Sequence, residues 1–192
     1  KAANYGYKRD IIPLPSPGVG GACLSKDPYI LASVCKNYNV DNSLFLLGRK
    51  INEGMCQNIL TRLENEFILN SKNMKGSKIF ILGFSFKGRP ATSDMRDSST
   101  IDLVNSLLPK KAILYGNDPL VNKSEISSLG IIHTSLDEGF KNADAVIIMT
   151  NHIEYEHIDI DKLVKTMNKP AILMDGWQLF NSEILSKNTG IK

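Results

Sequence analysis

Short apolar runs alternate with amphipathic segments from residue 78 onward, and this alternation constrains the fold more than any other feature. The apolar runs have the length of buried strands, and the segments between them have helical spacing. Strands that alternate with helices form parallel sheets, because each helix returns the chain to the start of the next strand. The sequence therefore predicts an α/β fold with a doubly wound parallel sheet. Strands are expected at residues 78–82, 112–115, 131–133, 145–149 and 171–174, and helices at residues 100–108, 124–129, 136–141, 160–167 and 182–186.

Residues 28–70 have helical periodicity. Tyr29, Ile30, Val34 and Tyr38 predict a first helix, and a long second helix is expected from about residue 42 to residue 70. Its apolar stripe consists of Leu44, Leu47, Ile51, Met55, Ile59, Leu63 and Phe67. Such a stripe needs a partner, which is either its own domain or a second subunit. Residues 71–77 have the composition of a linker, so we expect a helical region at residues 1–72 and a second domain at residues 73–192.

The composition limits the classes of function. A chain of 192 residues, 42% of them hydrophobic, can bury one good core or two small ones, and it has no apolar run long enough to cross a bilayer. The net charge of +3 is dispersed, which favours a small anionic ligand over nucleic acid. The three cysteines contain no CxxC pair, and the first residues do not have the pattern of a signal peptide, which together favour a cytoplasmic location. The three histidines do not have the spacing of metal ligands, so we expect no metal site. Cys35 and Cys56 lie in helical segments and are expected in the core.

A glycine-rich loop is followed by a thiol, an amine and a carboxylate within five residues, at Cys23, Lys26 and Asp27. Asp27 before Pro28 has the pattern of a helix N-cap followed by proline at the first helical position. The amides of the helix start and the Lys26 ammonium would favour a Cys23 thiolate, which is a nucleophile for carbonyl chemistry. The alternatives are a cysteine that is only a small buried apolar residue and a carboxylate that only caps the helix.

The loops at the carboxyl ends of the expected strands are the natural place for a ligand. They lie at residues 83–96, 116–120, 150–155 and 175–179. Neither the first of these loops nor residues 18–21 has the GxGxxG spacing of a dinucleotide-binding turn. A redox cofactor would therefore need a domain outside this sequence, and we expect the chain to be a fragment of a longer protein.

Five motifs follow one another along the chain: PSPGVGGACLSKDPY, ILGFSFKGRPATSDMRDSS, YGNDPLV, ADAVIIMTNHIEY and ILMDGWQLF. Their order and spacing resemble the central and C-terminal domains of the UDP-glucose/GDP-mannose dehydrogenase family. The resemblance implies oxidation of the C6 alcohol of a nucleotide sugar to a carboxylate, with two hydride transfers to NAD. It also implies an absent N-terminal NAD-binding domain, a homodimer formed through the central helical region, and a Rossmann-like UDP-sugar-binding domain. The fragment alone would be inactive.

The same resemblance implies roles for individual residues. Cys23 would attack the intermediate aldehyde to form a thiohemiacetal and then a thioester. Asp27 would assist proton transfer and position water, and Lys26 would lie near cofactor and substrate. Further substrate contacts are implied for Arg9, Gly18, Val19, Gly20, Phe86 and Lys87, and a contact with the NAD phosphates for Arg96. Without the motif, Lys87 would be an ordinary surface lysine and Arg96 would pair with Asp94 or Asp97.

Two positions depart from the pattern of many relatives. Trp177 stands where many have arginine, so a substrate contact would be lost or replaced by stacking, and Ala22 stands where the N-acetylhexosamine branch often has histidine. The PGVGG loop and the run Thr150-Asn151-His152 favour that branch, although His152 would otherwise be a solvated loop residue. We therefore expect UDP-N-acetylmannosamine or UDP-N-acetylglucosamine as substrate, with UDP-glucose as the alternative. A non-catalytic nucleotide-sugar-binding or dimerisation module is the alternative of another class.

Overall fold

The computed structural model describes residues 4–6, 15–181, 183 and 185. Its centre is a five-stranded parallel sheet with the strand order β3-β2-β1-β4-β5. The strands are β1 (Lys78–Leu82), β2 (Ile113–Asn117), β3 (Ile132–His133), β4 (Ala145–Ile148) and β5 (Ile172–Asp175). The predicted α/β fold with a doubly wound parallel sheet is confirmed, and the direction of winding changes between β1 and β4, where such sheets bind ligands.

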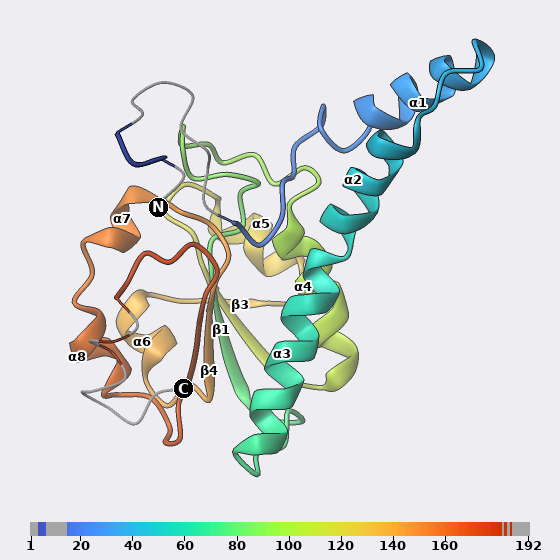
Figure 1. Ribbon diagram of the computed structural model, residues 1–192. Coiled ribbons are helices and arrows are strands. Elements are labelled where there is room, and N and C mark those ends of the chain that lie inside the picture. Colours follow the sequence, from blue (N-terminus) through green and yellow to red (C-terminus); the bar gives the residue numbers. More distant parts are fainter. Residues whose placement is uncertain (1–3, 7–14, 182, 184, 186–192) are drawn as a thin grey trace.

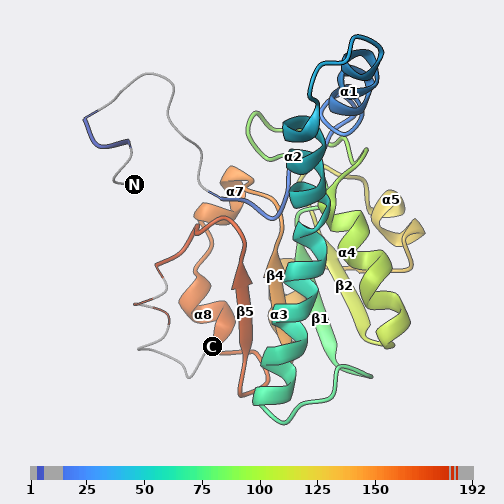
Figure 2. The same ribbon diagram turned by 45° about the vertical axis from the view of Figure 1, so that its right-hand side comes forward.

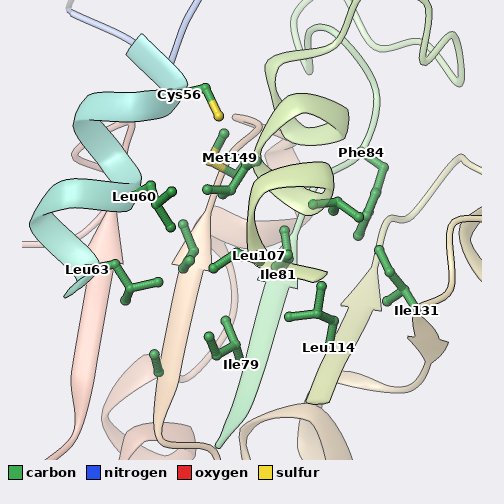
Figure 3. Packing of buried hydrophobic residues seen from close by; sticks show 14 of the residues in the cluster. Cys56, Leu60, Leu63, Ile79, Ile81, Phe84, Leu107, Leu114, Ile131 and Met149 are labelled. Atoms are coloured by element: carbon green, nitrogen blue, oxygen red, sulfur yellow. The ribbon is translucent and has the colours of Figure 1, made fainter. Parts of the chain in front are cut away.

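Helices cover both faces of the sheet (Figure 1). Successive side chains of a strand point to opposite faces, so Ile79 and Ile81 enter one apolar cluster while Phe80 and Leu82 enter the other. The first cluster is covered by α3 (Met55–Leu69), α4 (Ser99–Leu107) and α5 (Lys123–Ser128), and the second by α6 (Leu136–Phe140), α7 (Ile153–Glu156) and α8 (Ile160–Val164). Figure 3 shows Leu60 of α3 directed into the first cluster.

Two short elements were not predicted. Helix α7 occupies part of the expected loop at residues 150–155, and a 3-10 turn, η2 (Leu108–Lys110), extends the end of α4. Both are too short to produce a clear helical period in the sequence. Most of the helix expected at residues 182–186 lies outside the described residues. Arg9, a predicted substrate contact, also lies outside them. Among the described residues, no helix is both long enough and apolar enough to cross a membrane.

The prediction of one continuous helix at residues 42–70 is wrong in one respect. The structure has two helices there, α2 (Ser43–Glu53) and α3, which are divided at Gly54. Gly54 keeps a near-helical backbone, with φ −73° and ψ −12°, and its N–H donates to the Lys50 carbonyl at 3.1 Å. The chain therefore passes from one helix to the next without a loop (Figure 2).

Burial also differs between the two halves of this predicted helix. Leu63 and Phe67 of α3 are buried against the sheet, whereas Leu44 and Leu47 of α2 are 76% and 54% exposed. Helix α1 (Asp27–Asn37) packs against α2 and projects with it away from the sheet (Figure 1). Cys56 is buried as expected, but the prediction that Cys35 lies in the core is wrong, because α1 has no sheet to cover it.

Candidate active site

Cys23 lies in a turn that leads directly into α1. Its carbonyl accepts hydrogen bonds from the Lys26 and Asp27 N–H groups at 3.1 and 2.9 Å. Asp27 is the first helical residue, so the prediction that it is the N-cap is wrong. The backbone at Lys26 is already helical, and the amides of Tyr29 and Ile30 donate to the Lys26 carbonyl rather than to a capping carboxylate. The Asp27 carboxylate instead accepts a hydrogen bond from the Lys26 ammonium.

Cys23, Lys26 and Asp27 are all exposed, so Cys23 is not a core cysteine. The hydrogen bond to Asp27 and its charge raise the pKa of Lys26, and Cys23 adds to this effect. The pKa of Arg96 is raised chiefly by Asp94, and Cys23 again contributes. Two cations, Lys26 and Arg96, therefore lie close enough to Cys23 to interact with it electrostatically.

The glycine loop packs directly against the loop that follows β1. A side chain at Gly20 would overlap the Asp97 carbonyl oxygen, and a Cβ at Gly21 would lie 2.9 Å from the Phe86 ring. The two loops are also joined by a hydrogen bond, because the Ser25 hydroxyl donates to Asp97 Oδ2 at 2.8 Å. Glycine is required for this close approach. Two motifs that are far apart in the sequence thus meet in one site, above the carboxyl end of the sheet (Figure 2).

Val19 is held from the opposite side by Asn52 of α2. The Val19 N–H donates to Asn52 Oδ1 at 2.8 Å, and Asn52 Nδ2 donates to the Val19 carbonyl at 2.9 Å. Neighbouring Gly18 has φ +140° and lies against Ser99, at the start of α4. Val19, Asn52 and Ser99 line a cavity of about 300 Å³. Asn52 was not among the predicted site residues, since no local sequence pattern links it to Val19, 33 positions away.

The loop after β1 also contains Phe86, Lys87 and Arg96. Phe86 and Lys87 are half-buried, and the Lys87 ammonium lies 5.1 Å from the centre of the Phe86 ring. Arg96 pairs with Asp94, with Nη2 2.7 Å from Oδ2, and this pairing lowers the pKa of Asp94. The Arg96 side chain is still 73% exposed. Arg96 thus forms the ion pair with Asp94 that was the alternative to a contact with NAD.

His152 is completely buried and is not a solvated loop residue. Its Nε2 lies 3.2 Å from Oδ2 of Asp118, which follows β2. Burial raises the pKa of Asp118, but hydrogen bonds from His152 and from the backbone amides of Phe84, Leu120 and Val121 outweigh burial and hold that pKa at about 2. Asp118 was not among the predicted site residues, although its position at the carboxyl end of a strand, within the motif YGNDPLV, was a usable signal.

Trp177 is anchored at the end of β4, where its Nε1 donates to the Met149 carbonyl at 2.9 Å. Asp175, the last residue of β5, accepts hydrogen bonds from the amides of Trp177 and Phe180 and so holds the turn that contains Trp177. Burial raises the pKa of Asp175. The indole N–H is thus already occupied by the protein. Among the described residues, no group of three His, Cys, Asp or Glu side chains could hold a metal ion.

The UDP binding domain of the UDP-glucose/GDP-mannose dehydrogenase family matches residues 80–182, and the central domain of that family matches residues 5–54. A UDP-N-acetyl-D-mannosamine dehydrogenase from Pyrococcus horikoshii is 33% identical over 172 residues, which cover 88% of this chain and 37% of that protein. A UDP-glucose 6-dehydrogenase from Rhizobium meliloti is 28% identical over 174 residues, covering 90% of this chain and 38% of that protein.

Similarity extends to solved structures. The structure of the UDP-D-ManNAc dehydrogenase from Pyrococcus horikoshii superposes with a TM-score of 0.78 at 28% identity, over 94% of this chain and 40% of that one. The chain thus spans less than half the length of the relatives that it matches. Because one family domain alone covers more than half of these residues, the chain belongs to the UDP-glucose/GDP-mannose dehydrogenase family.

Proposed function

We propose that this chain is the central and UDP-sugar-binding part of an NAD-dependent UDP-N-acetylhexosamine 6-dehydrogenase, which oxidises the C6 alcohol of the sugar to a carboxylate. The central part comprises residues 1–72, and the UDP-sugar-binding part comprises residues 73–192. One observation carries the proposal: Cys23 is exposed, with Lys26, Asp27 and Arg96 around it, on a loop packed against Phe86. A module that only binds nucleotide sugar or only dimerises has no need of an exposed nucleophile in this setting.

Lys26 and Arg96 fit a role in holding NAD, since both are exposed cations beside Cys23 and could pair with phosphate oxygens. Oxidation of an alcohol to an acid releases two hydrides, and two NAD molecules, bound one after the other, would each accept one of them. The relatives are more than twice as long as this chain, which leaves room for a separate NAD-binding domain outside these 192 residues. The chain alone would then reduce no NAD.

Cys23 carries the covalent chemistry in this proposal. Its thiolate adds to the C6 carbonyl of the intermediate aldehyde and forms a carbon–sulfur bond, while the carbon–oxygen double bond becomes single and the oxygen takes up a proton, giving a thiohemiacetal. After the second oxidation the sugar is held as a thioester. Asp27 accepts a proton from the water that hydrolyses this thioester, and the carbon–sulfur bond breaks to return the thiolate and release the carboxylate. Lys26 stabilises the negative charge on sulfur and oxygen.

The substrate contacts are proposed on both sides of Cys23. The glycine loop would wrap around the sugar with Gly18, Val19 and Gly20. Asn52 binds the backbone of Val19, and Ser99 lies against Gly18. Phe86 would contact the substrate, and Lys87 would neutralise the diphosphate. Arg9 would reach the sugar of a neighbouring subunit.

The N-acetylhexosamine preference rests on the loop motifs and on relatives whose names include UDP-N-acetyl-D-mannosamine dehydrogenase. UDP-glucose 6-dehydrogenases match with similar identity, so UDP-glucose remains the second candidate. We further propose a cytoplasmic location, supported by three free cysteines.

A homodimer is proposed through the projecting helical pair. Apolar side chains of α1 and α2 are exposed together, among them Ile30, Val34, Leu44, Leu47 and Ile51. An exposed apolar surface of this kind marks an interaction site, and the same surface on a second copy is its simplest partner.

The complete protein, assayed with NAD and a panel of UDP-sugars, tests the proposed activity. We expect UDP-N-acetylmannosamine or UDP-N-acetylglucosamine to be oxidised faster than UDP-glucose. Faster oxidation of UDP-glucose would favour the second candidate. Turnover of NAD by the 192 residues alone would refute the need for a separate NAD-binding domain.

The same assay includes Cys23→Ser and, as a matched control, Cys35→Ser on α1. Cys23→Ser should reduce acid formation by about a hundredfold or more and leave UDP-sugar affinity within about threefold, because the thiolate acts in the reaction rather than in binding. Cys35→Ser should leave both nearly unchanged. Undiminished acid formation by the Cys23 variant would exclude the thioester route.

A further inference from the structure

The loop at residues 83–88 is hydrogen-bonded to the loops that follow the two neighbouring strands. The amides of Phe84 and Ser85 donate to Asp118 Oδ2 at 2.7 and 3.1 Å. The Ser85 carbonyl accepts from the Thr150 hydroxyl at 3.0 Å, and the Gly88 amide donates to Asn151 Oδ1 at 3.1 Å. These partners follow β2 and β4, so the shape of the loop after β1 depends on both neighbouring strands.

His152 completes this network. Its Nε2 lies 3.0 Å from Ser85 Oγ and 3.2 Å from Asp118 Oδ2, and its side chain has no exposed surface. The Ser85 hydroxyl donates its own proton to the Lys87 carbonyl at 3.0 Å. Ser85 Oγ and Asp118 Oδ2 therefore both act as acceptors toward His152, which requires the proton to be on Nε2. This one N–H group joins the loops that follow all three central strands.

A serine, a histidine and an aspartate in contact could also indicate a hydrolytic triad, but the geometry excludes that role. In a triad the serine and the aspartate bind opposite nitrogens of the imidazole. Here both lie on Nε2, and Nδ1 has no hydrogen-bond partner. Ser85 is only 1% exposed, so no substrate reaches its hydroxyl. The network is part of the scaffold of the loop.

We propose that His152 and Asp118 are positioning residues for nucleotide-sugar binding: they fix the loop at residues 83–88 so that Phe86 and Lys87 are presented to the ligand. The proposal rests on the proposed function, which assigns the diphosphate contact to Lys87. His152 orients Ser85, and Ser85 in turn holds the Lys87 carbonyl. Because the Phe86 ring also lies against Gly21, a displaced loop would disturb the turn that carries Cys23.

Three variants of the chain separate positioning from general stability. His152→Phe removes the shared N–H, whereas His152→Gln retains a side-chain amide that can donate to the same acceptors. Tyr155→Phe is the control, because Tyr155 is equally buried and its ring packs edge-on against His152, a contact that phenylalanine keeps. Its hydroxyl donates to the Asn117 carbonyl at 2.9 Å, and this carbonyl still accepts from the Gly83 amide when the hydroxyl is removed, so no amide at residues 84–88 loses a partner. UDP is the probe in calorimetric titrations, and hydrogen exchange of the amides at residues 84–88 reports on the loop without ligand.

We expect His152→Phe to weaken UDP binding about tenfold and to accelerate exchange at residues 84–88 by at least about tenfold, since a buried donor is lost. His152→Gln should restore both to within about threefold of wild type, and Tyr155→Phe should change neither. The positioning role is overturned if exchange at residues 84–88 is unchanged in His152→Phe, or if UDP affinity does not fall with it, or if Tyr155→Phe has the same effects. A wild-type chain that binds no UDP would count against the proposed function, while the exchange comparison would still decide whether His152 orders the loop.

Discussion

Asp118 is a single carboxylate that accepts hydrogen bonds from four backbone amides, those of Phe84, Ser85, Leu120 and Val121. Burial alone would favour its neutral form, yet these donors and His152 hold its pKa at about 2. The charge on this side chain is thus used to fix two loops. Cys23 differs from Asp118 in both respects. Its side chain is exposed, and the nearby backbone amides donate hydrogen bonds to its carbonyl rather than to its side chain.

This low pKa makes the stability contribution of Asp118 depend on pH. The folded-state pKa of about 2 lies below the unfolded value of about 3.9, so the contribution is fully present above about pH 4 and is lost as the pH falls through 2. The contribution amounts to about 2 kcal/mol. In urea unfolding, Asp118→Asn should therefore be less stable than wild type at pH 7, and the difference should shrink as the pH approaches 2.

Asp137→Asn is a suitable control for that measurement, since Asp137 is exposed in the first turn of α6. We expect it to follow the wild-type pH profile closely. If the gap between wild type and Asp118→Asn were the same at pH 7 and pH 2, the carboxylate charge would not be the source of the stability.

At the scale of elements, α2 is joined to the glycine loop before Cys23 through one side chain. Asn52 binds both the N–H and the carbonyl of Val19, as a neighbouring strand would. The next residue, Glu53, accepts a hydrogen bond from the Tyr29 hydroxyl of α1 at 2.7 Å, which raises the pKa of Tyr29. The end of α2 therefore supports the Cys23 turn from both directions, through Val19 before it and α1 after it.

Asn52→Leu should loosen this support while preserving the size of the side chain. Both hydrogen bonds to Val19 are lost, so we expect exchange of the Val19 amide to accelerate by about tenfold or more and the free energy of unfolding to fall by about 1 to 2 kcal/mol. Hydrogen exchange and chemical denaturation measure these effects. Asn65→Leu, the same change at an exposed position of α3, should alter neither quantity. Equal exchange rates at Val19 in the two variants would contradict the supporting role.

At the scale of the whole molecule, the structure has a covered sheet and an uncovered helical pair. Figure 1 shows α1 and α2 extending beyond the sheet, and Leu44 and Leu47 remain 76% and 54% exposed. The turn that carries Cys23 begins at the junction of these two parts. Association through the helical pair would therefore lie next to the site, connected to it by Asn52 and Glu53.

Leu47→Glu tests the proposed homodimer. Wild type should sediment as a dimer, and the variant should be mainly monomeric, because a buried unpaired carboxylate would be costly at the interface. Ile132→Glu is the control, since Ile132 on β3 is 49% exposed and lies on the sheet rather than on the helical pair. Dimerisation that survives Leu47→Glu, or a strictly monomeric wild type, would rule out this interface.

The sequence by itself determined the parallel sheet, because strands buried on both faces leave short apolar runs between amphipathic segments. All five strands lie within two residues of their predicted positions. It also placed Cys23, Lys26 and Asp27 together, since they are neighbours in the chain. Only the tertiary structure decided that α2 leaves its apolar face uncovered, that Asn52 supports Val19, and that His152 joins Asp118 to Ser85. Such pairings connect residues 33 to 67 positions apart, and they form only when the fold brings unrelated segments into contact.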